Sequence, residues 1–494
     1  DKINIVKPGF INIFFKNIFW QDQLKQVLED KTKIKKKKNK KINIEYVSAN
    51  PTGLMHIGHA RGAVLGDVIS NLLDEEGYSV TREYYINDAG NQIKLLVDTI
   101  LFHLENFKKK NFSKELPEHL YPGRYLNDIS KNILKNNPDI LNEVNKYEKI
   151  RSESITIILN DIKCDLSKLG VYHDVFTSEK KVTTNEAVKS VVSFLKKNNF
   201  AYEGFQAPPK GIKEKNWKKS KQLLFKSKLI SDDSDRALIK NNGQLTYFMS
   251  DIVYHRNKIK KKYDTLLNVW GVDHSGYVAR LKNAISVMFG NKVNLEVKLT
   301  SLVNLIKNNK PIKMSKRKGT YITLREVLSE VGKDALRFMM VSRSSEKVID
   351  FNFDIVKSKT KENPVFYVQY AHARCYSIQR LANENKKKNQ STEINFSLLN
   401  LSEEIVLIKN LANFNKILSI SCQKYEPHRV CNFLYELSKN FHNYWSLGTN
   451  DKSKRILVRG DENLSNARLA LINGVKIIIK KGLEILSISA PDQM

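Results

Sequence analysis

The chain is organised around one stretch, Ala49-Asn50-Pro51-Thr52-Gly53-Leu54-Met55-His56-Ile57-Gly58-His59. A strand-like run, residues 42–47, precedes it, and the apolar residues of 60–76 recur at helical spacing. A strand, a glycine-bearing turn and a helix start form a phosphate site, because backbone N–H groups and the positive end of the helix dipole converge there. His56 and His59 would lie on one face of the first helical turn. We expect Gly58 to leave room for a nucleotide close to the backbone.

A second motif, Lys313-Met314-Ser315-Lys316, continues into Arg317-Lys318-Gly319-Thr320. Four clustered cations suit chemistry in which negative charge accumulates on a leaving pyrophosphate. Alone, the His-x-Gly-His tetrad fits a helix start with two surface histidines equally well. The two motifs in this order favour nucleotide chemistry, and the pair resembles the signature of class I aminoacyl-tRNA synthetases.

The length and composition indicate a globular protein of two or more domains. The chain has 494 residues, of which 41% are hydrophobic and 27% charged. No apolar run reaches membrane-spanning length, so no transmembrane helix is expected. The four cysteines (Cys164, Cys375, Cys422 and Cys431) include no Cys-x-x-Cys pair. This argues against a zinc knuckle or a disulfide framework and favours a reducing compartment, so we expect a cytoplasmic location.

The formal net charge of +31 suits a partner with a phosphate backbone. The chain is also rich in Lys, Ile and Asn, as an AT-biased genome would produce, and we assign about half of the excess charge to that cause. The charge therefore supports nucleic-acid binding without proving it.

The sequence divides into three regions. Residues 1–35 read as the remnant of an N-terminal domain, with two strands joined by a turn at Pro8-Gly9. Since the sequence opens with Asp1, we expect that an N-terminal region has been lost. Residues 36–332 read as an α/β domain with a parallel sheet and a helical insertion at about 102–180, and residues 333–494 as helical.

Three features inside the α/β region carry further expectations. Residues 201–231 read as an exposed hairpin or loop. Cys164 and His173 have no partner at metal-binding spacing, and we assign Cys164 to the core and His173 to the surface.

Other candidate site residues follow strands, where the ligands of parallel sheets gather. Asn87, Asp88 and Gln92 come after the second strand, although Asp88 as a helix cap explains one of the three equally well. Tyr247 and Asp251 are four residues apart and would share a helical face, and a routine cap-and-pair explains them too. A strand also leads into Gly271-Val272-Asp273, where a carboxylate could accept hydrogen bonds from ribose hydroxyls.

The helical region interleaves aromatic and basic residues along 363–374. Further aromatic residues follow at Tyr425, Phe433, Tyr435, Phe441, Tyr444 and Trp445. Most should be core, but exposed aromatics among Lys and Arg would suit stacking on unpaired bases.

Together these segments resemble the arginyl-tRNA synthetase family, over the whole chain. The resemblance rests on residues 47–53, 85–92, 270–274 and 313–320, on the 364–373 run, and on the tetrad Asp334-Ala335-Leu336-Arg337. It implies a Rossmann-type catalytic domain followed by an all-α anticodon-binding domain. It also implies a two-step reaction in which ATP activates L-arginine and the arginyl group passes to tRNA(Arg). Mg²⁺ would accompany ATP, with no metal held by the protein, and we expect a monomer without membrane association.

The resemblance also assigns site residues. Catalysis would fall to His56, His59, Lys313 and Lys316. ATP would be bound by Ala49, Asn50, Pro51, Thr52, Gly53, Leu54, Met55, His56, Ile57, Gly58, His59, Asp273, Met314, Ser315 and Lys316. Arginine would be bound by Glu45, Asn50, His59, Tyr247, Asp251 and His274, with Glu45 and Asn50 on the first strand. The assignment is physically reasonable because a guanidinium seeks carboxylate partners, here Glu45 and Asp251.

Two departures and three rivals accompany this interpretation. The family has Pro where this chain has Leu54, and its N-terminal domain corresponds here only to the residues before Lys31. The rivals are the cysteine enzyme of class I, a small nucleotidylyltransferase and a non-catalytic tRNA-binding paralogue. The cysteine spacing disfavours the first, the second motif and the helical region disfavour the second, and the intact motif pair disfavours the third.

Overall fold

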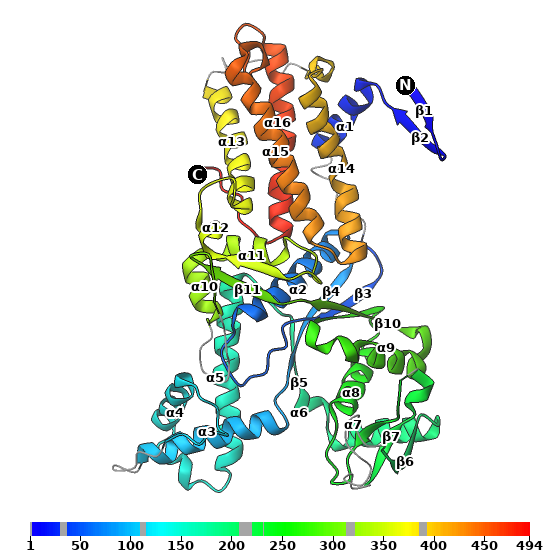
Figure 1. The fold of residues 1–494 in the computed structure, drawn as a ribbon, viewed down its shortest axis with the longest axis vertical. Coiled ribbons are helices and arrows are strands. Elements are labelled where there is room, and N and C mark those ends of the chain that lie inside the picture. Colours follow the sequence, from blue (N-terminus) through cyan, green and yellow to red (C-terminus); the bar gives the residue numbers. More distant parts are fainter. Residues whose placement is uncertain are drawn as a thin grey trace.

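The computed structural model describes residues 2–29, 37–108, 115–206, 220–230, 232–312, 322–384 and 393–494. In Figure 1 a helical bundle stands above a central sheet, and two lobes extend below it. The predicted class, an α/β domain followed by a helical domain, is confirmed. Within the described residues, no helix is long and apolar enough to cross a membrane.

The central sheet has five parallel strands in the order β10-β9-β3-β4-β5. Its strands are β3 (Lys41–Glu45), β4 (Ser79–Ile86), β5 (Val175–Ser178), β9 (Thr265–Gly271) and β10 (Asn294–Thr300). Helix α2 (Ile57–Glu75) crosses from β3 to β4 and packs on β4 and β9. A Cβ on Gly66 would lie 2.2 Å from Cγ of Tyr46, so only glycine allows α2 to approach this closely. The carboxyl ends of β3, β4, β5 and β9 therefore meet along one edge.

The first lobe is the predicted helical insertion. It contains α3 (Asn91–Lys108), α4 (Arg124–Asn136) and α5 (Lys146–Leu169). The following residues, 175–178, form strand β5 of the central sheet, so the helical part is shorter than predicted.

The burial of Cys164 and His173 is opposite to our expectation. Cys164 lies on α5 and is exposed. His173 packs on the Tyr46 ring, with ring centroids 4.3 Å apart, and burial lowers its pKa to about 4. Tertiary packing decides both positions, and sequence spacing does not reveal it.

The second lobe has its own hydrophobic core. Strands β6 (Ala201–Phe205), β7 (Lys221–Phe225) and β8 (Arg236–Ile239) form an antiparallel sheet, so the predicted hairpin is confirmed in its described part. The helices of this lobe are α6 (Glu179–Val182), α7 (Asn185–Lys197), α8 (Tyr247–Lys260) and α9 (Ser275–Phe289).

A small sheet and three short helices connect the sheet domain to the bundle. The sheet has the order β12-β11-β13, with β11 (Val303–Lys307), β12 (Lys310–Ile312) and β13 (Ile349–Asn352). The helices are α10 (Leu324–Val331), α11 (Lys333–Val341) and α12 (Phe353–Lys357). The buried Arg337 guanidinium donates to Leu486 O (2.7 Å), Leu169 O (3.0 Å) and Asp67. The arginine of the Asp-Ala-Leu-Arg tetrad thus fastens the bundle to α5 and α2.

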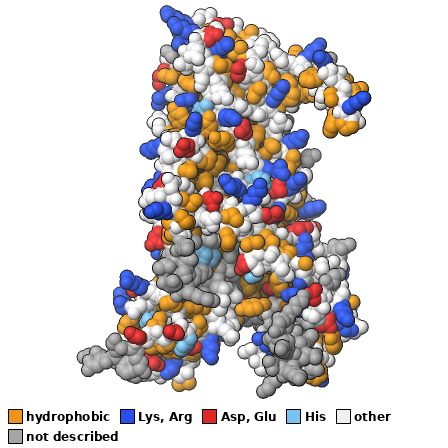
Figure 2. All heavy atoms as spheres, viewed as in Figure 1, with side chains coloured by type: hydrophobic (Ala, Val, Ile, Leu, Met, Phe, Trp, Pro, Cys, Tyr) orange, Lys and Arg blue, Asp and Glu red, His pale blue; other side chains and the backbone are white. Residues whose placement is uncertain are grey.

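The bundle contains α13 (Pro364–Glu384), α14 (Ser402–Lys424), α15 (His428–Asn450) and α16 (Glu462–Ile485). Helix α1 (Asn17–Glu29) packs on α14 and α16, with Leu24 fully buried. Strands β1 (Lys2–Val6) and β2 (Phe10–Phe14) form the predicted hairpin, which projects from the bundle (Figure 1). Figure 2 shows apolar side chains on this projection, and basic side chains spread over the visible face of the bundle.

Candidate active site

The loop between β3 and α2 has an unusual backbone. Val47 (φ 69°) and Ser48 (φ 38°) adopt positive φ angles that non-glycine residues rarely occupy. Two tyrosines anchor the loop: Tyr84 donates to Ala49 O (2.7 Å) and Tyr125 donates to Thr52 O (2.6 Å). Such strain persists only where surrounding contacts hold it, and it is concentrated at functional sites.

The two histidines form the start of α2. Nδ1 of His56 accepts from the Gly58 N–H (3.1 Å), and Nδ1 of His59 accepts from the His56 N–H (3.2 Å). Their rings stack with centroids 3.9 Å apart, so the predicted common face is confirmed. Because each Nδ1 accepts, a neutral ring carries its proton on Nε2.

Gly58 has a further role besides the predicted space for a nucleotide, which stays a prediction. A Cβ at this position would lie 2.9 Å from Cε1 of His56. The glycine therefore makes room for the imidazole of His56.

The second motif, including Lys313, Met314, Ser315 and Lys316, lies outside the described residues. The chain that follows it returns to the histidines. Thr323 forms an isolated β-bridge with His56, and the Leu324 N–H donates to Met55 O (2.8 Å). Residues 322–324 are thus attached beside the start of α2.

On the other side of β3, Glu45 is already paired. Its Oε2 lies 2.7 Å from Nζ of the buried Lys258, which is also 3.7 Å from Oε2 of Glu83. Burial opposes ionisation of Glu83, but Lys258 and hydrogen bonds from Thr177 and Asn43 hold its pKa below the usual value. Glu45 therefore has a cationic partner that it shares with Glu83, and its binding of a guanidinium stays a prediction.

Asp251 lies on α8, as predicted, and accepts a hydrogen bond from the Tyr277 hydroxyl (2.6 Å). Burial raises the pKa of Asp251 to about 7; the Tyr277 hydrogen bond lowers it, whereas the nearby Glu45 and Glu179 raise it. Burial also raises the pKa of Glu179. Burial and the charges of Glu179, Asp251, Glu45 and Asp88 raise the pKa of Tyr85, so this ring lies among carboxylates. We refer to Glu45, Glu179 and Asp251, whose charges act on Tyr85, as the acidic cluster.

The sequence analysis missed three of these residues: Glu179, Tyr277 and Tyr85. Glu179 directly follows β5, so the rule that ligands gather at the carboxyl ends of strands could have identified it. The sequence gives no sign that Tyr277 pairs with Asp251. Their contact arises only because the fold packs α9 against α8.

The remaining candidates lie around this edge. Asn50 is not on the first strand, which ends at Glu45; its amide donates to Gln92 Oε1 (2.7 Å). Asp88 accepts from the Ser178 hydroxyl (2.7 Å) and the Lys180 N–H (2.9 Å), so the fold uses it to hold the end of β5.

Three further candidates are exposed. Tyr247 is 73% exposed at the start of α8. Asp273 and His274 follow β9, with His274 Nε2 3.5 Å from the Asp273 carboxylate. His274 also approaches the Trp270 ring, with centroids 5.9 Å apart.

The helical bundle carries an aromatic and basic cluster formed by Tyr370, Arg374, His442 and Trp445. The Arg374 guanidinium lies 4.4 Å from the Tyr370 ring centroid and 5.4 Å from that of Trp445, and Nη1 is 3.1 Å from His442 Nδ1. Trp445 is 36% exposed, whereas Phe441 and Tyr444 are core, as most of these aromatics were predicted to be.

No group of three or more His, Cys, Asp or Glu residues in the described part of the chain could hold a metal ion.

Comparison with known proteins agrees with this geometry. The catalytic-domain model of class I (R) tRNA synthetases matches residues 23–361, and the DALR anticodon-binding domain matches residues 368–494. The match over residues 23–361 shows that the chain has the catalytic domain of a class I tRNA synthetase.

The relatives specify the family. The arginine–tRNA ligase of Pelagibacter ubique is 42% identical over 100% of this chain and 86% of its own length, as is that of Wolbachia pipientis wMel. The structure of Thermus thermophilus arginyl-tRNA synthetase shares the fold, with a TM-score of 0.76 at 19% identity over 100% of this chain and 88% of that one. The chain belongs to the arginine–tRNA ligase family, enzymes that join arginine to tRNA at the expense of ATP.

Proposed function

We propose that the chain carries out both steps of arginyl-tRNA synthesis at the carboxyl edge of its central sheet. In the first step the carboxylate of L-arginine attacks the α-phosphate of ATP, and pyrophosphate leaves. In the second step a hydroxyl of the terminal adenosine of tRNA(Arg) takes the arginyl group, and AMP leaves. The observation that carries this proposal is that an acidic cluster and a pair of stacked histidines both follow strands at the carboxyl edge of the central sheet.

His56 and His59 bind the phosphates of ATP in this proposal. With each Nδ1 accepting from the backbone, each neutral imidazole presents an Nε2–H donor, which suits a phosphate oxygen. Residues 49–55 and Ile57 form the rest of the nucleotide cradle, with the loop fixed by Tyr84 and Tyr125. The chemistry needs no protein nucleophile, so positioning and electrostatics supply the rate enhancement.

Lys313 and Lys316, supported by Met314 and Ser315 of the same motif, neutralise the pyrophosphate as it leaves. The attachment of Thr323 to His56 supports this role, because it anchors the end of the segment that carries both lysines beside the histidines. Mg²⁺ enters with ATP and is held mainly by phosphate oxygens, as is usual for this ion.

The guanidinium of arginine binds to Asp251 and Glu179. Glu45 shares the cation of Lys258 with Glu83, whereas Asp251 and Glu179 are the carboxylates of the cluster whose pKa values are raised. A buried carboxylate with a raised pKa gains most from an arriving cation, because the cation restores its ionised form. In this proposal Glu45 holds Lys258 and Ser48 in position. The Ser48 hydroxyl donates to the Glu45 carboxylate (3.3 Å).

The remaining candidates take peripheral roles. The Asn50 amide, held by Gln92, binds the main-chain groups of arginine, with His59 nearby on α2. Tyr247 forms the rim of the amino-acid pocket. Asp273 accepts from the ribose of ATP, and we place His274 with the ribose because it contacts Asp273.

The bundle binds the anticodon arm of tRNA(Arg). The cluster of Tyr370, Arg374, His442 and Trp445 offers a partly exposed aromatic face backed by a cation, an arrangement on which unpaired bases stack. The net charge of +31 supports the contact with a polyanion.

We also propose that the protein acts as a monomer in the cytoplasm, where its tRNA substrate is used in translation. Light scattering with and without tRNA measures the assembly directly. A mass of two chains in the absence of tRNA would contradict the monomer.

The decisive experiment is ATP–pyrophosphate exchange with each amino acid in turn, with and without total tRNA. Of the amino acids, only arginine should support exchange, and we expect this exchange to require bound tRNA, to which arginine then becomes attached. Exchange driven by cysteine, or by no amino acid, would refute the proposed function.

A further inference from the structure

A lysine side chain is buried beside the acidic cluster. Lys258 extends from α8 to the central sheet and is 1% exposed. Its ammonium lies 2.7 Å from Oε2 of Glu45 and 3.7 Å from Oε2 of Glu83. These two glutamates occupy paired positions on the neighbouring strands β3 and β4. Like charges at paired positions of a sheet repel each other, so the one cation that both carboxylates share lets the sheet accommodate them.

The ammonium of Lys258 is held in one place. It lies 4.3 Å from the centroid of the Tyr254 ring, a cation–π contact. Tyr254 in turn packs on Tyr85, with ring centroids 4.3 Å apart. Glu83 is fixed as well, because the Asn43 amide donates to its carboxylate (2.6 Å). Lys258 therefore supplies a positive charge at a fixed point next to the cluster.

Stability alone does not account for this buried charge. An ion pair removed from water contributes little net stability, because the cost of desolvating both groups offsets their attraction. The position of Lys258 indicates a role in the site instead. Asp251 lies seven residues earlier on α8, so the two side chains share a face of the helix. Burial raises the pKa of Asp251 to about 7, and the charge of Lys258 is among the influences that lower it.

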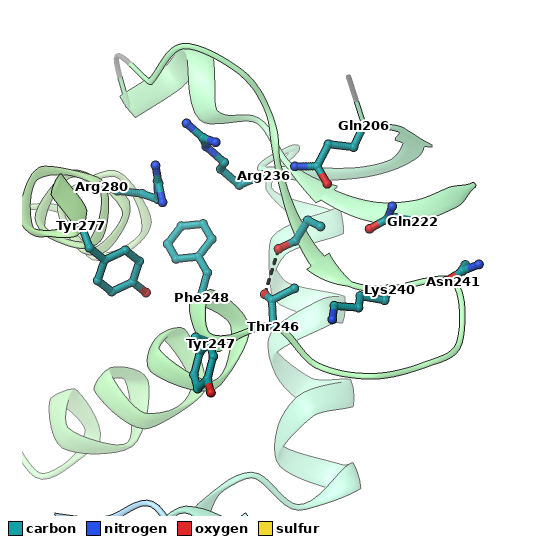
Figure 3. Close-up of a pocket in the computed structure, with 11 residues that line it drawn as sticks. Gln206, Gln222, Arg236, Lys240, Asn241, Thr246, Tyr247, Phe248, Tyr277 and Arg280 are labelled. Carbon is teal, nitrogen blue, oxygen red and sulfur yellow. Dashed lines mark hydrogen bonds between the residues drawn. The ribbon is translucent and has the colours of Figure 1, made fainter. Parts of the chain in front are cut away.

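The charged and titratable groups that surround Asp251 come from five elements: Glu45 (β3), Tyr85 (β4), Glu179 (α6), Lys258 (α8) and Tyr277 (α9). Figure 3 shows the Tyr277 ring beside Phe248 at the start of α8, where the two ring centroids are 6.2 Å apart. His255 adds no charge, because burial lowers its pKa to about 3. Lys258 is the one cation of this set.

Arginine and lysine present their positive charges to such a set differently. A guanidinium is planar and carries five donors in a fixed fork, so it can pair with two carboxylates at once. A primary ammonium is a compact point charge with three donors. Lys258 already places such a point charge at Glu45. The ammonium of a lysine substrate would meet this like charge, whereas a guanidinium can span Asp251 and Glu179.

We propose that Lys258 is a positioning residue for amino-acid selection, which holds Glu45 in place and makes the acidic cluster favour a guanidinium over a primary ammonium. The inference rests on the function proposed above and deepens it, since it assigns the discrimination against lysine to a residue that does not touch the substrate. Lys258 acts through the carboxylate that it pairs with and through its charge on Asp251.

The test removes the lysine in a form that can fold. Lys258→Met alone would leave Glu45 and Glu83 without their shared cation, so it is combined with Glu83→Gln, which restores the net charge of the wild type. L-Lysine is then measured as an inhibitor of arginine-dependent ATP–pyrophosphate exchange in the presence of tRNA. The ratio of the inhibition constant of lysine to KM for arginine should fall about tenfold, because a like-charge contact has been removed. KM for ATP should not change.

The matched control removes another buried ion pair. Arg468 Nε lies 2.7 Å from Glu404 Oε1 in the bundle, and the two residues are 3% and 0% exposed. Arg468→Met with Glu404→Gln should keep the wild-type preference for arginine over lysine, whatever its melting temperature. A loss of preference equal to that of the Lys258 variant would overturn the proposal, because it would trace the loss to general destabilisation.

The pH dependence provides a second readout. A nearby cation favours the ionised form of a carboxyl, so loss of Lys258 should raise the pKa of Asp251. The midpoint of the pH profile of KM for arginine should therefore move to higher pH in the double variant than in Glu83→Gln alone. A lysine with a purely structural role would leave this midpoint where it is.

The two proposals fail in different ways. A wild-type chain without arginine-dependent exchange would refute the proposed function and the role of Lys258 with it. Normal exchange by the wild type, with the same amino-acid preference and the same pH midpoint in the Lys258 variant, would refute the role of Lys258 alone.

Discussion

The two sides of the catalytic edge are built in different ways. The histidine side, His56 and His59, is formed by contacts within four residues at the start of α2. The acidic side, Glu45, Glu179 and Asp251, comes from three separate elements and depends on Tyr277 from a fourth. The difference shows that a chemistry common to many nucleotide enzymes fits in one short motif. Recognition of one particular amino-acid side chain needs residues that the fold brings together from distant segments.

The electrostatics of the two sides differ as well. The backbone fixes the tautomer of the histidines, so they present donors without any change in charge. On the acidic side, burial and the charges of nearby carboxylates raise the pKa values of Asp251 and Glu179. This is therefore the side whose state depends on pH and on the arrival of a cation.

The largest expected effect concerns the nucleotide side. Lys316→Ala should slow arginine-dependent pyrophosphate exchange about 10³-fold while ATP binding weakens much less, because the lysine acts on charge that develops in the transition state. Lys310→Ala, an exposed lysine of β12, is the control and should be nearly silent. Equal losses in rate and in ATP binding would make Lys316 a ground-state contact.

The acidic side should respond with the opposite pattern. Asp251→Ala should raise KM for arginine about 100-fold, because removing one partner of a buried charge pair costs roughly 2–5 kcal/mol. KM for ATP should not change. Glu186→Ala, an exposed carboxylate on α7, should leave both constants near those of the wild type. An unchanged KM for arginine in the Asp251 variant would remove this residue from the pocket.

A single methyl group tests the histidine side in isolation. Gly58→Ala places a Cβ 2.9 Å from Cε1 of His56 and so displaces the imidazole from its cap. Exchange should fall about tenfold at unchanged KM for arginine, a typical cost of misplacing one catalytic donor. Gly62→Ala lies on the same helix, and its added Cβ would meet no atom within 4 Å, so it should behave as wild type. Equal behaviour of the two variants would show that the His56 position does not matter.

A smaller effect should appear in the pH dependence. Since the pKa of Asp251 is raised to about 7, its carboxyl is largely protonated at pH 6 and ionised at pH 8. KM for arginine should fall severalfold over this range as the anion forms. Tyr277→Phe removes a hydrogen bond that lowers this pKa, so the midpoint should move upward. A flat profile between pH 6 and 8 would contradict the raised pKa.

The same ionisation should cost stability. A carboxyl whose folded-state pKa is raised contributes stability that is present at low pH and is lost as the pH rises through about 7. Asp251→Asn should therefore show a higher melting temperature than wild type at pH 8 and a smaller difference at pH 5, measured by calorimetry. A lower melting temperature at pH 8 would show that the ionised carboxylate stabilises the apo protein.

Local pattern was enough to predict much of the fold and the histidine side. The strand, turn and helix around residues 42–76 and the change to a helical bundle follow from periodicity and glycine placement. The common face of His56 and His59 at the helix start follows from their spacing, whereas their capping of the helix was not predicted.

What the sequence could not reveal depends on contacts between distant segments. Lys258 neutralises Glu45 across a sequence separation of 213 residues, and Tyr277 reaches Asp251 from another helix. The burial of His173 and the exposure of Cys164 were likewise decided by packing. Periodicity carries no information on such pairs, so the sequence identified Asp251 but not the partners that set its charge.

The most direct test of the account measures binding of L-arginine and of L-citrulline, its uncharged isostere, by calorimetry in the presence of tRNA. Wild type should prefer arginine at least 100-fold, because unpaired buried carboxylates reject a neutral side chain. Asp251→Asn with Glu179→Gln, which keeps the shapes and removes both charges, should abolish that preference while ATP binding stays the same. An undiminished preference for arginine in the double variant would show that these two carboxylates do not read the guanidinium.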